Sequence, residues 1–261
     1  GGKFWALQAG TSHDLGDHFG RVFDIRFLDR DGERKWAFNT SFGLSHRAVG
    51  ATVMVHGDDA GLKLPPVVAS VQVIVIPIWR TNDDLAIVEE AVQRIIERLT
   101  PLARIRVDWR DDRTPGYKFN EWELKGAPLR LKVGPRDGAA DQTTVVRRDT
   151  REKQLVPMSS LAQVVEVLLG EIQTNLFGAA KRMLADHTAD VNSYDELALR
   201  VAANAGWSLA HWCGGVACEA QVKAETKATI RCIPRDLPPE TGQCIVCGGM
   251  SDRRVVFARA Y

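Results

Sequence analysis

The chain of 261 residues is 45% hydrophobic and 26% charged, enough apolar material for one large domain or two to three small ones, which excludes an intrinsically disordered chain. Its formal net charge of +1 neither requires nor excludes a polyanionic partner, because local clusters decide nucleic-acid binding. The most apolar run, from Val71 to Trp79, contains Pro77 and is followed by Arg80, so the sequence predicts a soluble chain without a membrane span. The first residues show neither an initiator Met nor a signal peptide, and we expect a fragment.

The first 69 residues predict strands and turns. Apolar patches at residues 22–27 and 51–55 indicate strands. The segment Asp29-Arg30-Asp31-Gly32 between them is a turn signal. The prolines of Leu64-Pro65-Pro66 break the pattern, and we expect a domain boundary near residues 68–70.

The middle of the chain predicts a small α/β domain. Residues 71–76 form a β-branched run typical of a buried parallel strand. Thr81 and Asp84 resemble a capping box, and apolar residues then recur at helical spacing as far as Leu99. We expect further strands at residues 105–107 and 129–133 and a short helix at 119–124. Alternation of strands and helices implies right-handed crossovers.

The last third predicts a long helix and a small tail. A basic stretch at residues 143–148 precedes apolar positions spaced for a helix that runs from Leu161 toward Met183. Beyond it we expect a short helix at residues 194–202 and strands at 229–233 and 255–258, arranged around cysteines.

The cysteines indicate a metal site. Cys213 and Cys218 form a C-x4-C pair and Cys244 and Cys247 a C-x2-C pair, each with glycines beside it, which predicts a closed, structural four-thiolate zinc site. Ordinary buried thiols are the alternative reading. Cys232 lies in an alternating run and is expected to be a buried core thiol. Because all five cysteines fall after position 212, a disulfide scaffold is disfavoured and a reducing cytoplasm is expected.

Several blocks resemble a known family. QAGTSHDLGDHFGRVFDI from Gln8 and TSFGLSHRAVGATVMVHGDDAGLKLPP from Thr40 resemble the end of the class II synthetase catalytic domain, as found in prolyl-tRNA synthetases of the archaeal/eukaryotic-like type. The second block resembles the class II motif 3. The resemblance continues through GYKFNEWELKGAPLRLKVGPRD, residues 116–137, to the cysteine pairs and Tyr261, so it covers essentially the whole chain.

The resemblance implies α/β and α+β folds in three parts. Residues 1–69 would be the end of an antiparallel-sheet class II catalytic domain, residues 70–172 an α/β anticodon-binding domain with a mixed sheet, and residues 173–261 a small α+β zinc-binding domain. The implied activity is ATP-dependent activation of proline and its transfer to tRNA(Pro), in a homodimer with Mg2+ accompanying ATP. Class II motifs 1 and 2 are not found in the sequence, so the isolated fragment is expected to be inactive.

The same resemblance implies residues on the ATP side of the catalytic site. Gln8, Thr11, Ser45 and Arg47 are expected to contact ATP, with Arg47 as the motif 3 arginine and the catalytic candidate. Adenylate formation builds negative charge on phosphate, and a guanidinium neutralises it in a fixed geometry. Taken alone, an arginine is more often a solvated surface charge.

A proline pocket is expected beside the nucleotide. The resemblance places His13 in it, with Ser41, Phe42 and Gly43 as its wall, and a snug wall suits a small apolar substrate. A lone histidine is more often structural. Phe42 and His46 stand where the family usually has Trp and Thr, which leaves amino-acid specificity open. The segment His56-Gly57-Asp58-Asp59 is expected to be the turn after the motif 3 helix, with a structural or interface role.

Between residues 104 and 136, basic and aromatic side chains alternate. Cations hold phosphate and aromatic faces stack on unpaired bases, which suits an anticodon loop. The alternative is that Phe119 and Trp122 are core and the arginines a solvated face. Carboxylates such as Glu121 or Glu123 are candidates to accept hydrogen bonds from the two anticodon guanines. The predicted anticodon residues are Arg110, Lys118, Glu121, Glu123, Arg130 and Arg136.

Two rival functions stay open. A related class II synthetase for threonine, glycine or histidine would share the catalytic end and the anticodon fold, but the zinc tail ending in Tyr261 argues against it. A non-catalytic, synthetase-derived tRNA- or RNA-binding module is consistent with the missing motifs 1 and 2.

Overall fold

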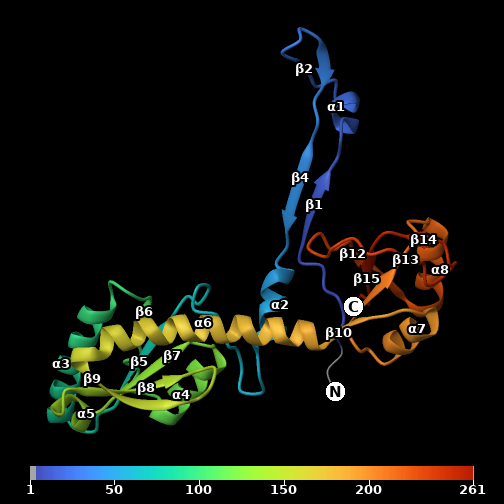
Figure 1. The fold of residues 1–261 in the computed structure, drawn as a ribbon. Coiled ribbons are helices and arrows are strands. Elements are labelled where there is room, and N and C mark those ends of the chain that lie inside the picture. The colour runs from blue at the N-terminus through green and yellow to red at the C-terminus, as the bar shows by residue number, and fades with distance from the viewer. Residues whose placement is uncertain (1–3, 261) are drawn as a thin grey trace. The chain divides into compact units, whose positions relative to one another are not determined.

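The structure is a computed structural model and describes residues 4–260 (Figure 1). The chain divides into two compact units. The α/β unit comprises residues 52–182, and the composite unit joins the residues up to 51 with those from 183 onward. Within residues 4–260, no helix is both long enough and apolar enough to cross a membrane.

A five-stranded sheet forms the α/β unit, with strand order β6-β5-β7-β8-β9. Strand β5 is parallel to β6 and β7, whereas β7, β8 and β9 are successively antiparallel, so the sheet is mixed as expected. Its strands are β5 (Val73–Pro77), β6 (Ile105–Val107), β7 (Leu129–Val133), β8 (Gln142–Arg147) and β9 (Lys153–Pro157).

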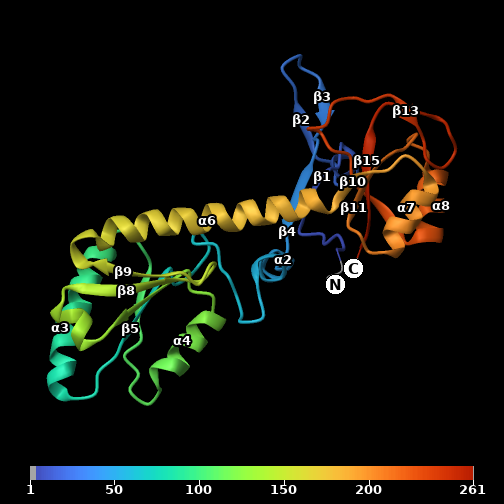
Figure 2. The same ribbon diagram turned by 60° about the horizontal axis from the view of Figure 1, so that its bottom comes forward.

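Helices cover the two faces of this sheet differently. One face carries α3 (Asn82–Leu99) and α6 (Leu161–Asp186), and the other carries α4 (Pro115–Leu124) (Figure 2). Every residue of β5 is buried because both faces are covered, which explains its continuous β-branched sequence. The predicted capping box is present, since the hydroxyl of Thr81 accepts from the backbone N–H of Asp84. A short helix, α5 (Pro135–Ala139), contacts α3.

The C-terminal part of the composite unit is a small α+β fold. A four-stranded sheet has the order β10-β11-β15-β12, and helices α7 and α8 accompany it. Its elements are β10 (Thr188–Asp190), α7 (Tyr194–Ala202), β11 (Trp207–His211), α8 (Val216–Thr226), β12 (Ala228–Cys232), β13 (Gly242–Gln243), β14 (Met250–Ser251) and β15 (Arg254–Arg259). The predicted helix at residues 194–202 and the strands near 229–233 and 255–258 are confirmed.

The N-terminal part of the composite unit consists of paired strands and short helices. Its elements are β1 (Gly10–Asp14), α1 (His18–Val22), β2 (Arg26–Leu28), β3 (Arg34–Trp36), β4 (Thr40–Leu44) and the first residues of α2 (Arg47–His56). Strand β1 pairs with β4 and β2 with β3, both antiparallel. The predicted turn between β2 and β3 is confirmed, with Gly32 at φ 81° and its N–H bound to the Asp29 carbonyl.

Two predictions for this region were wrong. Residues 51–55 lie in helix α2 and not in a strand, because Val49 and Val53 follow helical spacing and β-branching is only a weak preference. Residues 22–27 contain the end of α1 and a turn, and only Arg26 and Phe27 join a strand. Strand β8 occupies the stretch predicted only as basic, and β9, β10, β11 and α8 were not predicted.

Candidate functional site

The four residues predicted to contact ATP line one pocket of the composite unit. Gln8 and Thr11 belong to β1 and the segment before it, and Ser45 and Arg47 lie where β4 passes into α2. The pocket has a volume of about 410 Å³. The hydroxyl of Ser45 accepts from the backbone N–H of Arg47 at 3.3 Å, and the N–H of Ser45 donates to Ala9 at 3.2 Å. Their contacts with ATP stay a prediction.

The predicted proline wall divides between two faces of the β1–β4 pair. His13 lies opposite Ser41, and Thr11 lies opposite Gly43, so these residues share one face. The two strands lie close together at this point, since a Cβ on Gly43 would be only 3.1 Å from the Thr11 hydroxyl. Phe42 pairs with Ser12 on the other face and is 77% exposed. The strand register therefore separates Phe42 from the rest of the predicted wall.

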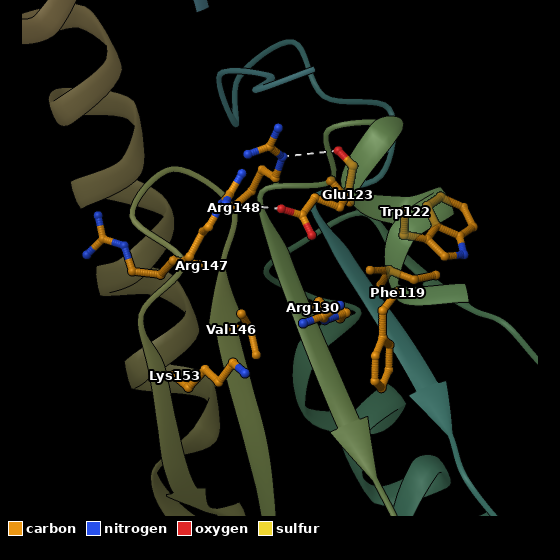
Figure 3. A pocket seen from close by; sticks show the side chains of 11 residues that line it. Phe119, Trp122, Glu123, Arg130, Val146, Arg147, Arg148 and Lys153 are labelled. Atoms are coloured by element: carbon orange, nitrogen blue, oxygen red, sulfur yellow. Dashed lines mark hydrogen bonds and ion pairs between the residues drawn. The ribbon is translucent and has the colours of Figure 1, made fainter. Parts of the chain in front are cut away.

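A second pocket, of about 360 Å³, opens on the α4 face of the sheet in the α/β unit (Figure 3). Arg130 of β7 places its guanidinium carbon 4.2 Å from the centre of the Phe119 ring. Burial lowers the pKa of Arg130, and the charge of Glu123 opposes that shift. Trp122 lies against the buried strand residues and is 7% exposed, so it belongs to the core. We call this cavity the α4 pocket. Its lining residues beyond α4 and β7 are Ile74, Ala127, Val146, Arg147, Arg148, Arg151 and Lys153.

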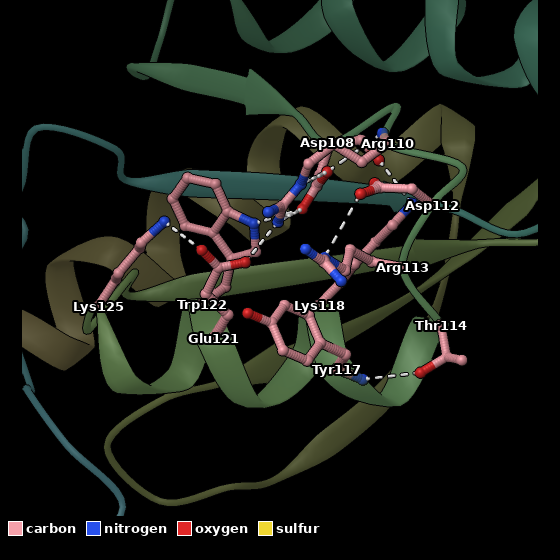
Figure 4. A network of polar contacts seen from close by, with 10 residues as sticks. All are labelled: Asp108, Arg110, Asp112, Arg113, Thr114, Tyr117, Lys118, Glu121, Trp122 and Lys125. Carbon is pink, nitrogen blue, oxygen red and sulfur yellow. Dashed lines mark hydrogen bonds and ion pairs between the residues drawn. The ribbon is translucent and has the colours of Figure 1, made fainter.

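The carboxylate of Glu121 takes part in a network of charged side chains beside the α4 pocket (Figure 4). Arg110 donates to the carboxylate of Asp108 at 2.8 and 2.6 Å and also contacts Glu121. Lys125 donates to the second oxygen of Glu121 at 2.7 Å. Hydrogen bonds from Arg110 and Lys125 lower the pKa of Glu121. Of the two candidate carboxylates, Glu123 is the one that lines the α4 pocket.

The other predicted anticodon residues lie in different surroundings. Lys118 is 3% exposed, and its ammonium group donates to the Asp108 carbonyl at 3.2 Å. Burial lowers the pKa of Lys118. Arg136 is exposed on α5 and does not line the α4 pocket. Contact of Lys118 with tRNA stays a prediction, but its burial does not support it.

The four predicted metal ligands come together in the composite unit. The sulfurs of Cys213, Cys218, Cys244 and Cys247 all lie within 4.8 Å of one another. Two separations, from Cys213 to Cys218 and to Cys247, are 3.7 Å. Four sulfurs about 2.3 Å from a tetrahedral zinc ion would be about 3.8 Å apart, whereas a disulfide bond is about 2.05 Å long. The donor set and its spacing therefore fit a zinc ion.

The chemistry of the cysteine cluster favours a cation. Hydrogen bonding to Cys247, with burial, raises the pKa of the Cys218 thiol to about 12. Burial works against ionisation of Cys244 as well, but backbone N–H groups of Cys247, Val246 and Cys213 lower its pKa to about 7. Crowded thiols that cannot all ionise beside one another are the ligands that a divalent cation stabilises.

Cys232 does not belong to the cluster, as predicted, but its expected burial was wrong. The cysteine is exposed. The pairing of β12 with β15 shifts register between Ile230 and Cys232, and such a bulge changes which face a side chain occupies.

Comparisons with known proteins agree with these folds. Residues 72–168 match the family of the anticodon binding domain, and residues 194–261 match that of the prolyl-tRNA synthetase C-terminal domain. The α/β unit and the tail thus define a portion of an aminoacyl-tRNA synthetase.

Individual relatives narrow this class. The proline–tRNA ligase of Chloroflexus aurantiacus is 46% identical over 259 residues, covering 98% of this chain and 54% of that protein. The proline–tRNA ligase of Natranaerobius thermophilus is 48% identical over 259 residues, covering 98% of this chain and 53% of that protein. The proline–tRNA ligase of Porphyromonas gingivalis is 44% identical over 257 residues, covering 98% of this chain and 52% of that protein. The chain belongs to the prolyl-tRNA synthetase family, as its motifs predicted, and corresponds to a C-terminal portion of such proteins. It spans about half the length of these curated relatives.

Sequence reasoning missed the basic residues contributed by the β8–β9 hairpin. Arg148, Arg151 and Lys153 line the α4 pocket together with Phe119, Trp122 and Glu123 of helix α4. The available signal was the β-branched run of residues 143–146, which favours a strand, followed by the polar turn Asp149-Thr150-Arg151.

Proposed function

We propose that the chain is the C-terminal part of a proline–tRNA ligase, which activates proline with ATP to prolyl-adenylate and transfers it to tRNA(Pro). The observation that carries this proposal is the similarity to proline–tRNA ligases along 98% of the chain, at 44–48% identity. The division into an anticodon-binding fold and a family-specific tail supports it.

In this proposal the α4 pocket takes an anticodon base. A guanine presents N1–H and N2–H donors on one edge and the O6 and N7 acceptors on another. The carboxylate of Glu123 suits the donors and the guanidinium of Arg130 suits the acceptors, while Phe119 supplies an aromatic face for stacking. Lys153, which is exposed at the pocket, would meet a neighbouring phosphate.

The pocket between β1 and β4 would take the nucleotide. We assign Arg47 to the phosphate charge that develops as pyrophosphate leaves, and Gln8, Thr11 and Ser45 to polar contacts with ATP. His13, Ser41 and Gly43 would meet proline from their common face, with Phe42 contributing only from the opposite one. Mg2+ would accompany ATP and offset part of the phosphate charge.

The cysteine cluster would hold one structural zinc ion. Its four thiolates leave no coordination position open for chemistry. Closing two loops onto one ion would stabilise a tail whose sheet has only four strands. A homodimer and a cytoplasmic location are further expectations of the family resemblance and rest on it alone.

The test is amino-acid-dependent pyrophosphate exchange by the protein expressed from the complete gene. Proline is the expected substrate, and threonine, glycine and histidine are the controls. Exchange with one of the controls in place of proline would favour the related synthetases. Absence of exchange with every amino acid, in protein that binds tRNA, would favour the non-catalytic RNA-binding module.

A further inference from the structure

The turn around Asp58, which the proposed chemistry leaves without a role, is packed against the α4 pocket. Residues 58–64 run along the end of α4, with the Leu62 N–H bound to the Leu124 carbonyl at 3.0 Å and the Leu64 N–H bound to Gly126 at 3.3 Å. A Cβ on Gly61 would lie 2.5 Å from the Cα of Leu124. The two backbones therefore approach too closely for any side chain between them.

Arg148 joins this turn to the pocket. Its guanidinium donates to both carboxylate oxygens of Asp58, at 3.1 and 2.5 Å, and to the Gly61 carbonyl at 3.2 Å. The remaining nitrogen, Nε, donates to the carbonyl of Glu123 at 3.0 Å. Because the Arg148 side chain is only 4% exposed, one buried guanidinium fixes the turn and the backbone of Glu123 together.

A second arginine spans the same two acids from the solvent side. Arg151 lies 3.7 Å from the carboxylate of Asp58 and 3.4 Å from that of Glu123. Lys63 adds a contact to Asp58 at 3.0 Å. Three cations thus surround Asp58, and hydrogen bonding to Arg148, above all, lowers the pKa of its carboxyl group. Asp58 consequently keeps its charge, and with it the position of both arginines, across the physiological range of pH.

A buried ion pair is weak support for stability, because desolvation offsets much of its attraction, but it fixes geometry. Here the geometry concerns Glu123, whose carboxylate lines the α4 pocket while its carbonyl is held by Arg148. Figure 3 shows Glu123 and Arg148 together at one end of this pocket. A carboxylate that reads base edges requires such support, since displacement of about 1 Å breaks a hydrogen bond.

We propose that Asp58 is a positioning residue for anticodon recognition, which holds Glu123 in its base-reading orientation through Arg148 and Arg151. The proposal rests on the proposed binding of anticodon guanine in the α4 pocket. Asp58 touches no base itself, and its effect is on discrimination between bases more than on the general affinity for RNA.

The test compares the full chain with its Asp58→Asn variant for binding of two RNA hairpins. One hairpin carries the proline anticodon, and the other has adenine in place of each anticodon guanine. We expect the preference for guanine to fall roughly tenfold in the variant, as for a lost polar base contact, with a much smaller change for the adenine hairpin. Asp58→Glu should restore part of the preference.

Asp59→Asn is the matched control, because it removes the same charge from the neighbouring exposed residue of the same turn. An unchanged guanine preference in folded Asp58→Asn protein would overturn the proposal. If that variant does not fold, the same comparison of hairpins is made with Arg151→Met, since the Arg151 side chain is 61% exposed and bridges the carboxylates of Asp58 and Glu123. An unchanged guanine preference in that variant would equally overturn the proposal. A wild-type chain without preference for guanine would instead refute the proposed pocket itself.

Discussion

The indole N–H of Trp122 donates to the carboxylate of Asp108 at 2.8 Å and thereby ties helix α4 to the end of strand β6. Arg110 binds the same carboxylate, which is 5% exposed. The bond between Trp122 and Asp108 fixes the helix that carries Phe119 and Glu123. The shape of the α4 pocket therefore depends on Asp108, which does not line it.

Asp108→Asn should destabilise the α/β unit by about 1.5–3 kcal/mol, the value of hydrogen bonds to a charged group. Urea unfolding followed by tryptophan fluorescence would measure this. Asp111→Asn, which alters an exposed acid three residues away, serves as the control and should change stability little. Equal stability of the two variants would contradict the role of Asp108.

The same carboxylate should make stability depend on pH. Hydrogen bonds from Arg110 hold the pKa of Asp108 well below its usual range in the folded state. Its contribution is therefore complete above the ordinary value of about 3.9 and is lost as pH falls through the lower folded pKa. Below about pH 4 the unfolding free energy should fall less steeply in Asp108→Asn than in the wild type. Parallel pH profiles would exclude this linkage.

Gly126→Ala should destabilise the α/β unit by about 1–3 kcal/mol. Gly126 has φ 76°, and a Cβ there would lie 2.6 Å from the Cβ of Leu62. Gly116→Ala is the control, because no atom outside its chain neighbours and its own helix backbone lies within 4 Å of the added Cβ, and alanine favours helix α4. Thermal unfolding should show a lower midpoint only for Gly126→Ala.

Arg130→Ala should weaken binding of the proline anticodon hairpin by about 1–3 kcal/mol, the value of a paired guanidinium–base contact. Fluorescence anisotropy over a range of salt concentrations would measure the affinity. Arg98→Ala, on the helix that covers the opposite face of the sheet, should leave it unchanged. Equal affinities of the wild type and Arg130→Ala would remove Arg130 from the RNA surface.

Protein purified without chelators should contain about one zinc ion per chain, as a closed four-thiolate site requires. Cys244→Ser should lose the metal and destabilise the tail, whereas Cys232→Ser should keep it, because Cys232 is exposed and outside the cluster. Metal analysis and near-ultraviolet circular dichroism would follow both effects. A metal content near zero in the wild type would refute the zinc assignment.

Local signals in the sequence predicted many of the elements. The β-branched run of β5, the capping box before α3 and the apolar spacing of α6 each lie within one segment, and all three elements were confirmed. The α8 helix lacked such a signal because it is only weakly amphipathic. Strands β8 and β9 were missed because each contains only two adjacent aliphatic residues, Val145-Val146 and Leu155-Val156, and so shows no alternation of apolar and polar residues.

The candidate sites were predictable only in part. The cysteine cluster followed from spacing, because each pair closes its own loop. That Glu123 and not Glu121 lines the α4 pocket could not be predicted, since Glu121 is held by Arg110, which is eleven residues away and reaches it only in the folded domain. The separation of Phe42 from His13 depends on the register of two strands that lie far apart in the sequence.

The sheet of the α/β unit ends on both sides in strands that discourage pairing with another chain. Strand β6 has only three residues, and β9 begins with Lys153 and ends with Pro157, which has no N–H to donate. Short edges, charged side chains and proline all hinder the addition of a further strand. Concentrated protein should therefore resist edge-to-edge aggregation through this domain, and contacts between copies that involve this domain would use its helices or loops.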